Sequence, residues 1–188
     1  MRRYLKRKRA LTTTTAITTR QQLIEYTTSE WNTFVSCIDG LTEAQWTSPV
    51  DLAGWSVKDH VAHVTQWDIA VIELFRNGVP MRRTLGLAGD IWSPEEYDPL
   101  NEQLRQLTIA DPVGKVRANR DATWMALIST LETMSDSVLA APATESGLNV
   151  DDTTNWSLLQ ELVVYLGGHY VAHLGYIKLI AGDLCGVD

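Results

Sequence analysis

The sequence contains only two cysteines, Cys37 and Cys185, and they form no CxxC motif. This spacing predicts neither a disulfide framework nor a metal site built from cysteine alone, and it fits a reducing environment. No apolar run reaches the roughly 18–20 residues that a membrane-spanning helix needs, because His169 and His173 interrupt the longest one. The N-terminal residues also lack the apolar segment of a secretory signal. We therefore expect a cytoplasmic protein without a membrane partner.

Internal repeats, Gly-rich phosphate-binding loops and the alternating apolar pattern of β-strands are missing as well. The sequence instead has four long amphipathic segments with helix start and stop signals, over about residues 18–40, 56–77, 112–134 and 154–182. A further helix start is expected at Ser93-Pro94-Glu95-Glu96. This pattern predicts an all-α fold, a four-helix bundle with short extra helices in the loops.

The formal net charge of −7 conceals an uneven distribution. Six of the sixteen basic residues lie within the first nine, so the rest of the chain holds ten basic and twenty-three acidic residues, a net of −13. So acidic a body argues against nucleic acid as a partner. We expect a basic, disordered N-terminal tail over residues 1–17, one domain over residues 18–182, and a short C-terminal tail over residues 183–188.

All four histidines fall in two of the apolar helices: His60 and His63 in one, His169 and His173 in the other. Residues four apart share one helix face, and two imidazoles facing a core need partners because burial of unpaired polar groups costs free energy. A divalent metal such as zinc, nickel, copper or iron uses both imidazoles. One histidine of residues 56–77 would then complete a three-ligand site with an open position, the arrangement of a catalytic metal.

Other interpretations of these residues remain open. Buried histidines are often hydrogen-bonded core residues, and the HxxxH spacing also occurs by chance on solvated helix faces. Asp59, four residues before His63, either orients that imidazole or belongs to the first turn of its helix. Trp67 and Tyr165 would wall a substrate pocket or pack in the core.

Several of these residues also carry a family resemblance. Gly54-Trp55-Ser56-Val57-Lys58-Asp59, followed by Ala62-His63 and Trp67-Asp68, resembles the GWSxKD…AH…W(D/E) signature of the DinB/YfiT-like superfamily. The HxxxH of residues 169–173 is similar to the second metal motif of that superfamily. Asp98-Pro99-Leu100-Asn101 resembles its members too, including the ClbS/DfsB branch of self-protection proteins. The resemblance spans residues 18–181. The chain also resembles the metal-binding domain of mycothiol-dependent maleylpyruvate isomerase.

The resemblance implies that His63, His169 and His173 are the metal ligands and that His60 is a neighbour of the site. Tyr176, three residues after the last histidine, stands where many members have glutamine, so a role that rests on an amide is not carried over. The implied cofactor is a divalent metal such as zinc, nickel or iron, with a low-molecular-weight thiol as a candidate cosubstrate.

The function that the resemblance implies is a metal-dependent hydrolase or thiol transferase. Its substrate would be a reactive small molecule, in detoxification or self-resistance, and the protein would be a homodimer. The loops over residues 79–97 and 140–155 would set its specificity. The alternatives are a non-catalytic bundle that binds a metal or a ligand, and a purely structural bundle whose histidines are hydrogen-bonded.

Overall fold

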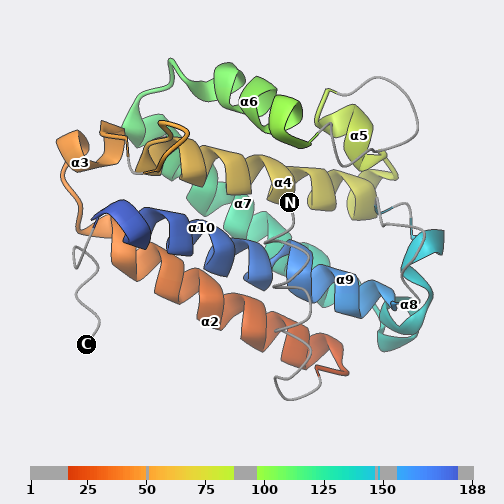
Figure 1. The fold of residues 1–188 in the computed structure, drawn as a ribbon. Helices are drawn as coiled ribbons and strands as arrows, with labels where there is room; N and C mark the ends of the chain where they lie inside the picture. The colour runs from red at the N-terminus through yellow and green to blue at the C-terminus, as the bar shows by residue number, and fades with distance from the viewer. Residues whose placement is uncertain (1–16, 50, 87–96, 147, 149–155, 182–188) are drawn as a thin grey trace.

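The structure is a computed structural model that describes residues 17–49, 51–86, 97–146, 148 and 156–181. Its long helices are α2 (Arg20–Asp39), α4 (Val57–Asn77), α7 (Val113–Thr133), and the consecutive pair α9 (Leu158–Tyr165) and α10 (Gly167–Ala181). Helix α4 packs against α7 and α10, and α2 packs against the same two helices, which closes a bundle (Figure 1). The predicted all-α four-helix bundle is confirmed.

Short helices occupy the described parts of the connections. They are α3 (Glu43–Thr47), α5 (Met81–Thr84), α6 (Tyr97–Thr108), α8 (Asp136–Ala140) and the 3₁₀ helix η2 (Ala143–Glu145). Helix α6 lies along the outer side of α4 (Figure 1). The helix start that the sequence predicts at residues 93–96 lies outside the described residues, as do residues 1–16 and 182–188.

The helix boundaries follow from local capping. Thr19 caps α2 by accepting a hydrogen bond from the backbone of Gln22, and Ser56 and Asp59 form a reciprocal capping box at the start of α4. Helix α4 ends at Gly78, whose positive φ of 66° suits a residue without Cβ. These boundaries were predicted from the sequence, because each depends on only a few neighbouring residues.

The fourth predicted helix is interrupted, which the sequence did not indicate. Leu166 has φ −104° and ψ −94°, and it separates α9 from α10. A Cβ at Gly167 would lie 2.9 Å from Cδ1 and 3.0 Å from Cζ of Tyr26, so the start of α10 approaches α2 more closely than a larger residue would allow. The two consecutive glycines at 167 and 168 permit this break.

The buried apolar residues form two clusters along the bundle. In α4, the buried apolar residues among 57–64 belong to one cluster and those among 67–74 to the other. In the pair α9 and α10, the change from one cluster to the other occurs between Leu166 and Tyr170. His169 lies at the second of these points, whereas His60, His63 and His173 lie among the residues of the cluster that contains Val61 and Tyr170. The histidines therefore border the place where the two apolar clusters meet.

A buried hydrogen bond joins α4 to α10 beside the histidines. The hydroxyl of Tyr170 donates to Oδ2 of Asp68 over 2.6 Å, and both residues are almost fully buried. Burial raises the pKa of Asp68 to about 8, although the hydrogen bond from Tyr170 opposes this shift. Burial and the neighbouring Asp68 also raise the pKa of Tyr170 well above its ordinary value.

The sequence led to two expectations that the fold addresses, one about membrane-spanning helices and one about the cysteines. None of the helices in the described part of the chain is both long and apolar enough to cross a membrane. Cys37 is buried in α2 and is disulfide-bonded, which the cysteine count did not lead us to expect. Cysteine spacing along a sequence does not report which sulfur atoms the fold brings together.

The buried Asp68 predicts how stability depends on pH. Its pKa is about 8 in the folded state, above the ordinary value of 3.8, so between these pH values the folded state binds more protons than the unfolded chain. Stability from this group is therefore lost as the pH rises through that range. Asp68→Asn keeps an acceptor for Tyr170 and cannot ionise. From pH 5 to pH 9, the melting temperature of the wild type should fall by several degrees relative to the variant; parallel curves would contradict the prediction.

Candidate metal centre

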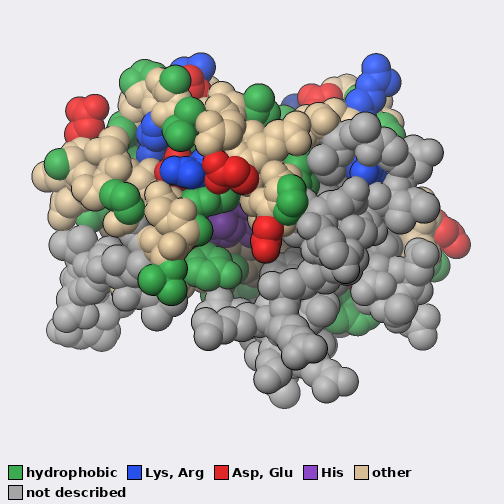
Figure 2. All heavy atoms as spheres, turned by 45° about the horizontal axis from the view of Figure 1, so that its top comes forward, with side chains coloured by type: hydrophobic (Ala, Val, Ile, Leu, Met, Phe, Trp, Pro, Cys, Tyr) green, Lys and Arg blue, Asp and Glu red, His purple; other side chains and the backbone are tan. Residues whose placement is uncertain are grey.

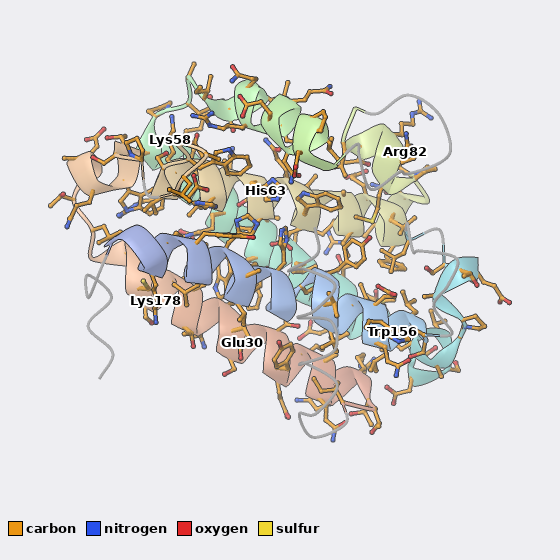
Figure 3. The ribbon with its side chains drawn as sticks, viewed as in Figure 1. Glu30, Lys58, His63, Arg82, Trp156 and Lys178 are labelled. Atoms are coloured by element: carbon orange, nitrogen blue, oxygen red, sulfur yellow. The ribbon has the colours of Figure 1, made fainter. Side chains whose placement is uncertain are left out.

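Three histidines from two helices converge beside the place where the two apolar clusters meet. His63 on α4 and His169 and His173 on α10 each offer a ring nitrogen, and these three nitrogens lie within 4.8 Å of one another. The ring centroids are 5.2 Å apart for His63 and His169, 4.7 Å for His63 and His173, and 4.6 Å for His169 and His173. Figure 3 shows His63 near the middle of α4, where this helix passes α10.

Burial keeps these imidazoles neutral. The pKa values of His63 and His173 are lowered well below their ordinary value, first by burial and then by the neighbouring histidines. His169 is the least buried of the three, and burial is also the largest cause that lowers its pKa, to about 4. All three are therefore deprotonated at neutral pH, which is the form that binds a metal.

The arrangement fits a divalent metal in both distance and chemistry. Ligand nitrogens that each lie about 2.0–2.1 Å from one zinc ion can be at most about 4.2 Å apart, so small ring movements would bring the three nitrogens into range. Nδ1 of His63 is buried, and no hydrogen bond reaches it from the described residues. Buried polar atoms without partners are costly, so a ligand for this cluster would relieve a cost of the folded state.

His60 belongs to the same cluster but stands outside the convergent three. Its Nδ1 lies 2.8 Å from Nδ1 of His173, and its Nε2 lies 3.3 Å from Oδ2 of Asp51. Burial lowers the pKa of His60 to about 4, although the charges of Asp51 and Asp59 oppose this shift. That His60 is a neighbour of the site, and not a ligand, stays a prediction.

Aromatic rings surround the histidines. The ring of Trp55 lies 5.3 Å from His60 and also 5.3 Å from His63. Trp67 lies 6.1 Å from His63, from His169 and from Tyr165, so Tyr165 borders the site through Trp67. Tyr176 is 45% exposed and stacks on His60 with a centroid distance of 5.9 Å, which leaves its phenol at the surface beside the cluster.

Asp59 has the contacts of the second of the two roles that we considered, a residue of the first turn of its helix. Its Oδ2 accepts hydrogen bonds from the backbone and hydroxyl of Ser56, and it lies 3.4 Å from Nε of Arg105 on α6. No hydrogen bond joins Asp59 to His63 among the contacts of the described residues. The structure therefore places Asp59 in the first turn of α4 and in an ion pair with α6.

One face of the molecule is hollowed above a histidine. Figure 2 shows a histidine at the bottom of a hollow near the centre of this face, with basic and acidic side chains on the upper rim and hydrophobic ones nearby.

Three residues near the site were not among those singled out for it. Trp55 was considered only as part of the GWSxKD segment, whereas its ring lies 5.3 Å from two of the histidines. Its proximity to the Ser56 cap and to His60 could have suggested this position. Nothing in the sequence near Asp51 or Arg105 indicates that they lie at the site. A loop brings Asp51 to His60, and the separate helix α6 brings Arg105 to Asp59.

Solved structures with similar folds cover most of the chain. The colibactin self-resistance protein ClbS, crystallised in complex with a dsDNA, has a TM-score of 0.68 and 12% sequence identity over 89% of this chain and 98% of its own. An uncharacterised protein from Escherichia coli UTI89 has a TM-score of 0.65 and 13% identity over 89% and 95%. A protein from Streptococcus pneumoniae has a TM-score of 0.67 and 12% identity over 88% and 91%. No curated protein matches the sequence significantly.

The dsDNA in the ClbS structure corrects one expectation. We had excluded nucleic acid as a partner because the body of the chain is acidic, and that exclusion is wrong, since a protein of this fold was crystallised with a dsDNA. The physical reason is that phosphate contacts depend on where the basic side chains lie and not on the net charge of the whole chain.

The sequence itself establishes the family. A profile of the DinB superfamily matches residues 26–177, a range that contains the GWSxKD segment, all four histidines, the whole of α4 and most of α10. The resemblance that the sequence motifs indicated is confirmed, and the chain belongs to the DinB superfamily.

Proposed function

We propose that this protein binds one divalent metal on His63, His169 and His173 and acts as a hydrolase or a low-molecular-weight-thiol transferase on a reactive small molecule. The observation that carries the proposal is the convergence of three neutral imidazoles, two of them buried and that of His169 partly buried. Zinc, nickel and iron all suit such a donor set. Detoxification or self-resistance is the expected role, and ClbS, a self-resistance protein of similar fold, supports it.

The chemistry assigns different tasks to the metal and to the chain. A divalent metal on three imidazoles lowers the pKa of a coordinated water or thiol and so supplies a nucleophile at neutral pH. The rings of Trp55 and Trp67 exclude water from two sides of the histidine cluster. Tyr176, at the exposed side, presents a phenol that can donate a hydrogen bond to a substrate.

The competing proposal is a bundle that binds a metal or a ligand without turnover. The three convergent histidines are the clearest candidates for a role in the site, and the sequence offers no general base as clear as these ligands. Turnover separates these two proposals, whereas metal content separates both from a purely structural bundle. A homodimer is part of the proposal and is checked by the mass of the purified protein in solution.

Substitution of the ligands tests the metal site. His63→Ala, His169→Ala and His173→Ala should each reduce metal content from about one per chain to near zero, because two imidazoles hold a metal far less tightly than three. His60→Ala is the matched control from the same helix and should retain about one metal per chain. Elemental analysis of protein purified without a histidine tag, with circular dichroism to confirm folding, gives the result. If His60→Ala lost the metal while His63→Ala retained it, His60 and not His63 would be the ligand from α4.

Turnover tests the enzyme proposal. The metal-loaded protein should consume an electrophilic small molecule, either with water or with a low-molecular-weight thiol, from a panel assayed by mass spectrometry. His173→Ala should fall to the uncatalysed rate, and re-addition of metal after chelation should restore the wild-type rate. If the loaded wild type shows stoichiometric metal and no turnover with any pair in the panel, the non-catalytic proposal is favoured.

A second candidate activity is association with double-stranded DNA, and the dsDNA in the ClbS structure is the observation that favours it. The full-length chain should bind a fluorescent DNA duplex, measured by anisotropy. Because contacts to phosphates release counterions, affinity should fall by at least about tenfold between about 50 and 200 mM salt. An anisotropy that stays constant up to a high protein concentration at low salt would exclude this activity.

A further inference from the structure

Asp51, His60 and His173 form a continuous line of polar contacts from a loop to the candidate metal ligands. Oδ2 of Asp51 lies 3.3 Å from Nε2 of His60, and Nδ1 of His60 lies 2.8 Å from Nδ1 of His173. His173 is one of the three convergent histidines, whereas His60 and Asp51 are not. Each ring nitrogen in this line faces one specific neighbour, so the positions of the protons are linked.

The contact between the two imidazoles requires one proton and one lone pair. A neutral imidazole carries a proton on only one of its two nitrogens. At 2.8 Å, two Nδ1 atoms that both carried a proton would repel each other, and two lone pairs would do the same. One of the rings must therefore donate through Nδ1, and the geometry of this pair alone does not show which.

Asp51 decides the direction of the line. A carboxylate oxygen only accepts hydrogen bonds, so it favours a proton on the Nε2 of His60 that faces it. The N–H at this nitrogen is not fully aligned with the oxygen, because no group meets strict hydrogen-bond geometry there, but the negative charge still disfavours a lone pair at this distance. With its proton on Nε2, His60 has a lone pair on Nδ1 and accepts from Nδ1–H of His173.

We infer that Asp51 and His60 are positioning residues that hold His173 in the Nδ1–H tautomer, so that its Nε2 keeps the lone pair that a metal needs. The inference rests on the proposed metal site and deepens it by naming two residues that prepare one of its ligands. Groups that hold the second nitrogen of a ligating imidazole fix its tautomer and orientation and increase its affinity for the metal.

The loop before α4 is built to hold Asp51 in this place. Its Oδ1 accepts hydrogen bonds from the backbone N–H groups of Ala53 and Trp55, each over 2.9 Å, which leaves Oδ2 directed to His60. The imidazole of His60 is in turn confined between the rings of Trp55, at 5.3 Å, and Tyr176, which stacks on it at 5.9 Å. Two backbone contacts and two aromatic contacts thus fix the geometry of the line.

Asp51→Asn tests the inference with the smallest change of shape. The amide oxygen can still accept from Ala53 and Trp55, and this requirement turns the NH₂ group toward His60. An NH₂ group only donates, so His60 must present a lone pair at Nε2 and a proton at Nδ1. That proton then faces Nδ1 of His173 and moves the proton of His173 to Nε2, where it competes with the metal.

Nitrogen NMR of ¹⁵N-histidine protein reads these tautomers without metal or activity. In the metal-free wild type at neutral pH, His60 should be the Nε2–H tautomer and His173 the Nδ1–H tautomer, and both should switch in Asp51→Asn. Assignment of His60 as Nδ1–H in the wild type would overturn the inference, whether or not the variant folds.

Metal affinity provides the second measurement. In competition with a chromophoric chelator, Asp51→Asn should raise the Kd for Zn²⁺ by about 10–100-fold while the stoichiometry stays at one. Glu132→Gln, the same loss of charge at an exposed position on α7, should leave the Kd unchanged. An unchanged Kd in Asp51→Asn would overturn the inference. A wild type that binds none of Zn²⁺, Ni²⁺ and Fe²⁺ would instead refute the proposed metal site, and the NMR result would still show whether Asp51 sets the tautomers.

Discussion

The packing of α4 against α10 is the contact on which the site depends. Each helix contributes two histidines, and neither pair can form a three-ligand cluster without the other. The buried hydrogen bond between Tyr170 and Asp68, 2.6 Å long, joins the same two helices among the apolar residues beside the histidines. Because a carboxyl and a phenol buried without each other would both be unsatisfied, this pair favours one alignment of α10 along α4 over others that bury the same apolar area.

Burial has a second consequence at this contact, because it decides the charge of every group placed there. The imidazoles lose their tendency to bind protons, and Asp68 keeps its proton to a higher pH than an exposed aspartate. The centre of the bundle therefore contains neutral donors and acceptors whose lone pairs are free for a ligand. Asp59 in the first turn of α4 and Arg105 on α6 form an ion pair at 3.4 Å.

Three features of the sequence led to expectations that the structure or the comparisons did not bear out. Net charge led us to exclude nucleic acid, although DNA binding is set by the local placement of basic groups. The spacing of two cysteines gave no indication that Cys37 is disulfide-bonded. The apolar period of residues 158–180 predicted one continuous helix, whereas contact with Tyr26 and two successive glycines divide it at Leu166. In each case the deciding partner is distant in the sequence.

The sequence by itself determined the four-helix bundle, most helix boundaries and the four histidines as the candidate site. Capping by Thr19 and Ser56 and the HxxxH spacing in α10 act over three or four residues, so they can be recognised without the fold. The family resemblance singled out His63, but only the tertiary structure shows that its ring converges with His169 and His173, whereas the two nitrogens of His60 face His173 and Asp51. The spacing of the histidines by itself is compatible with either histidine of α4 as the third ligand. How each of them meets α10 depends on the rotation of one helix about its axis relative to the other, and that rotation is fixed by side chains packed along the whole length of the bundle.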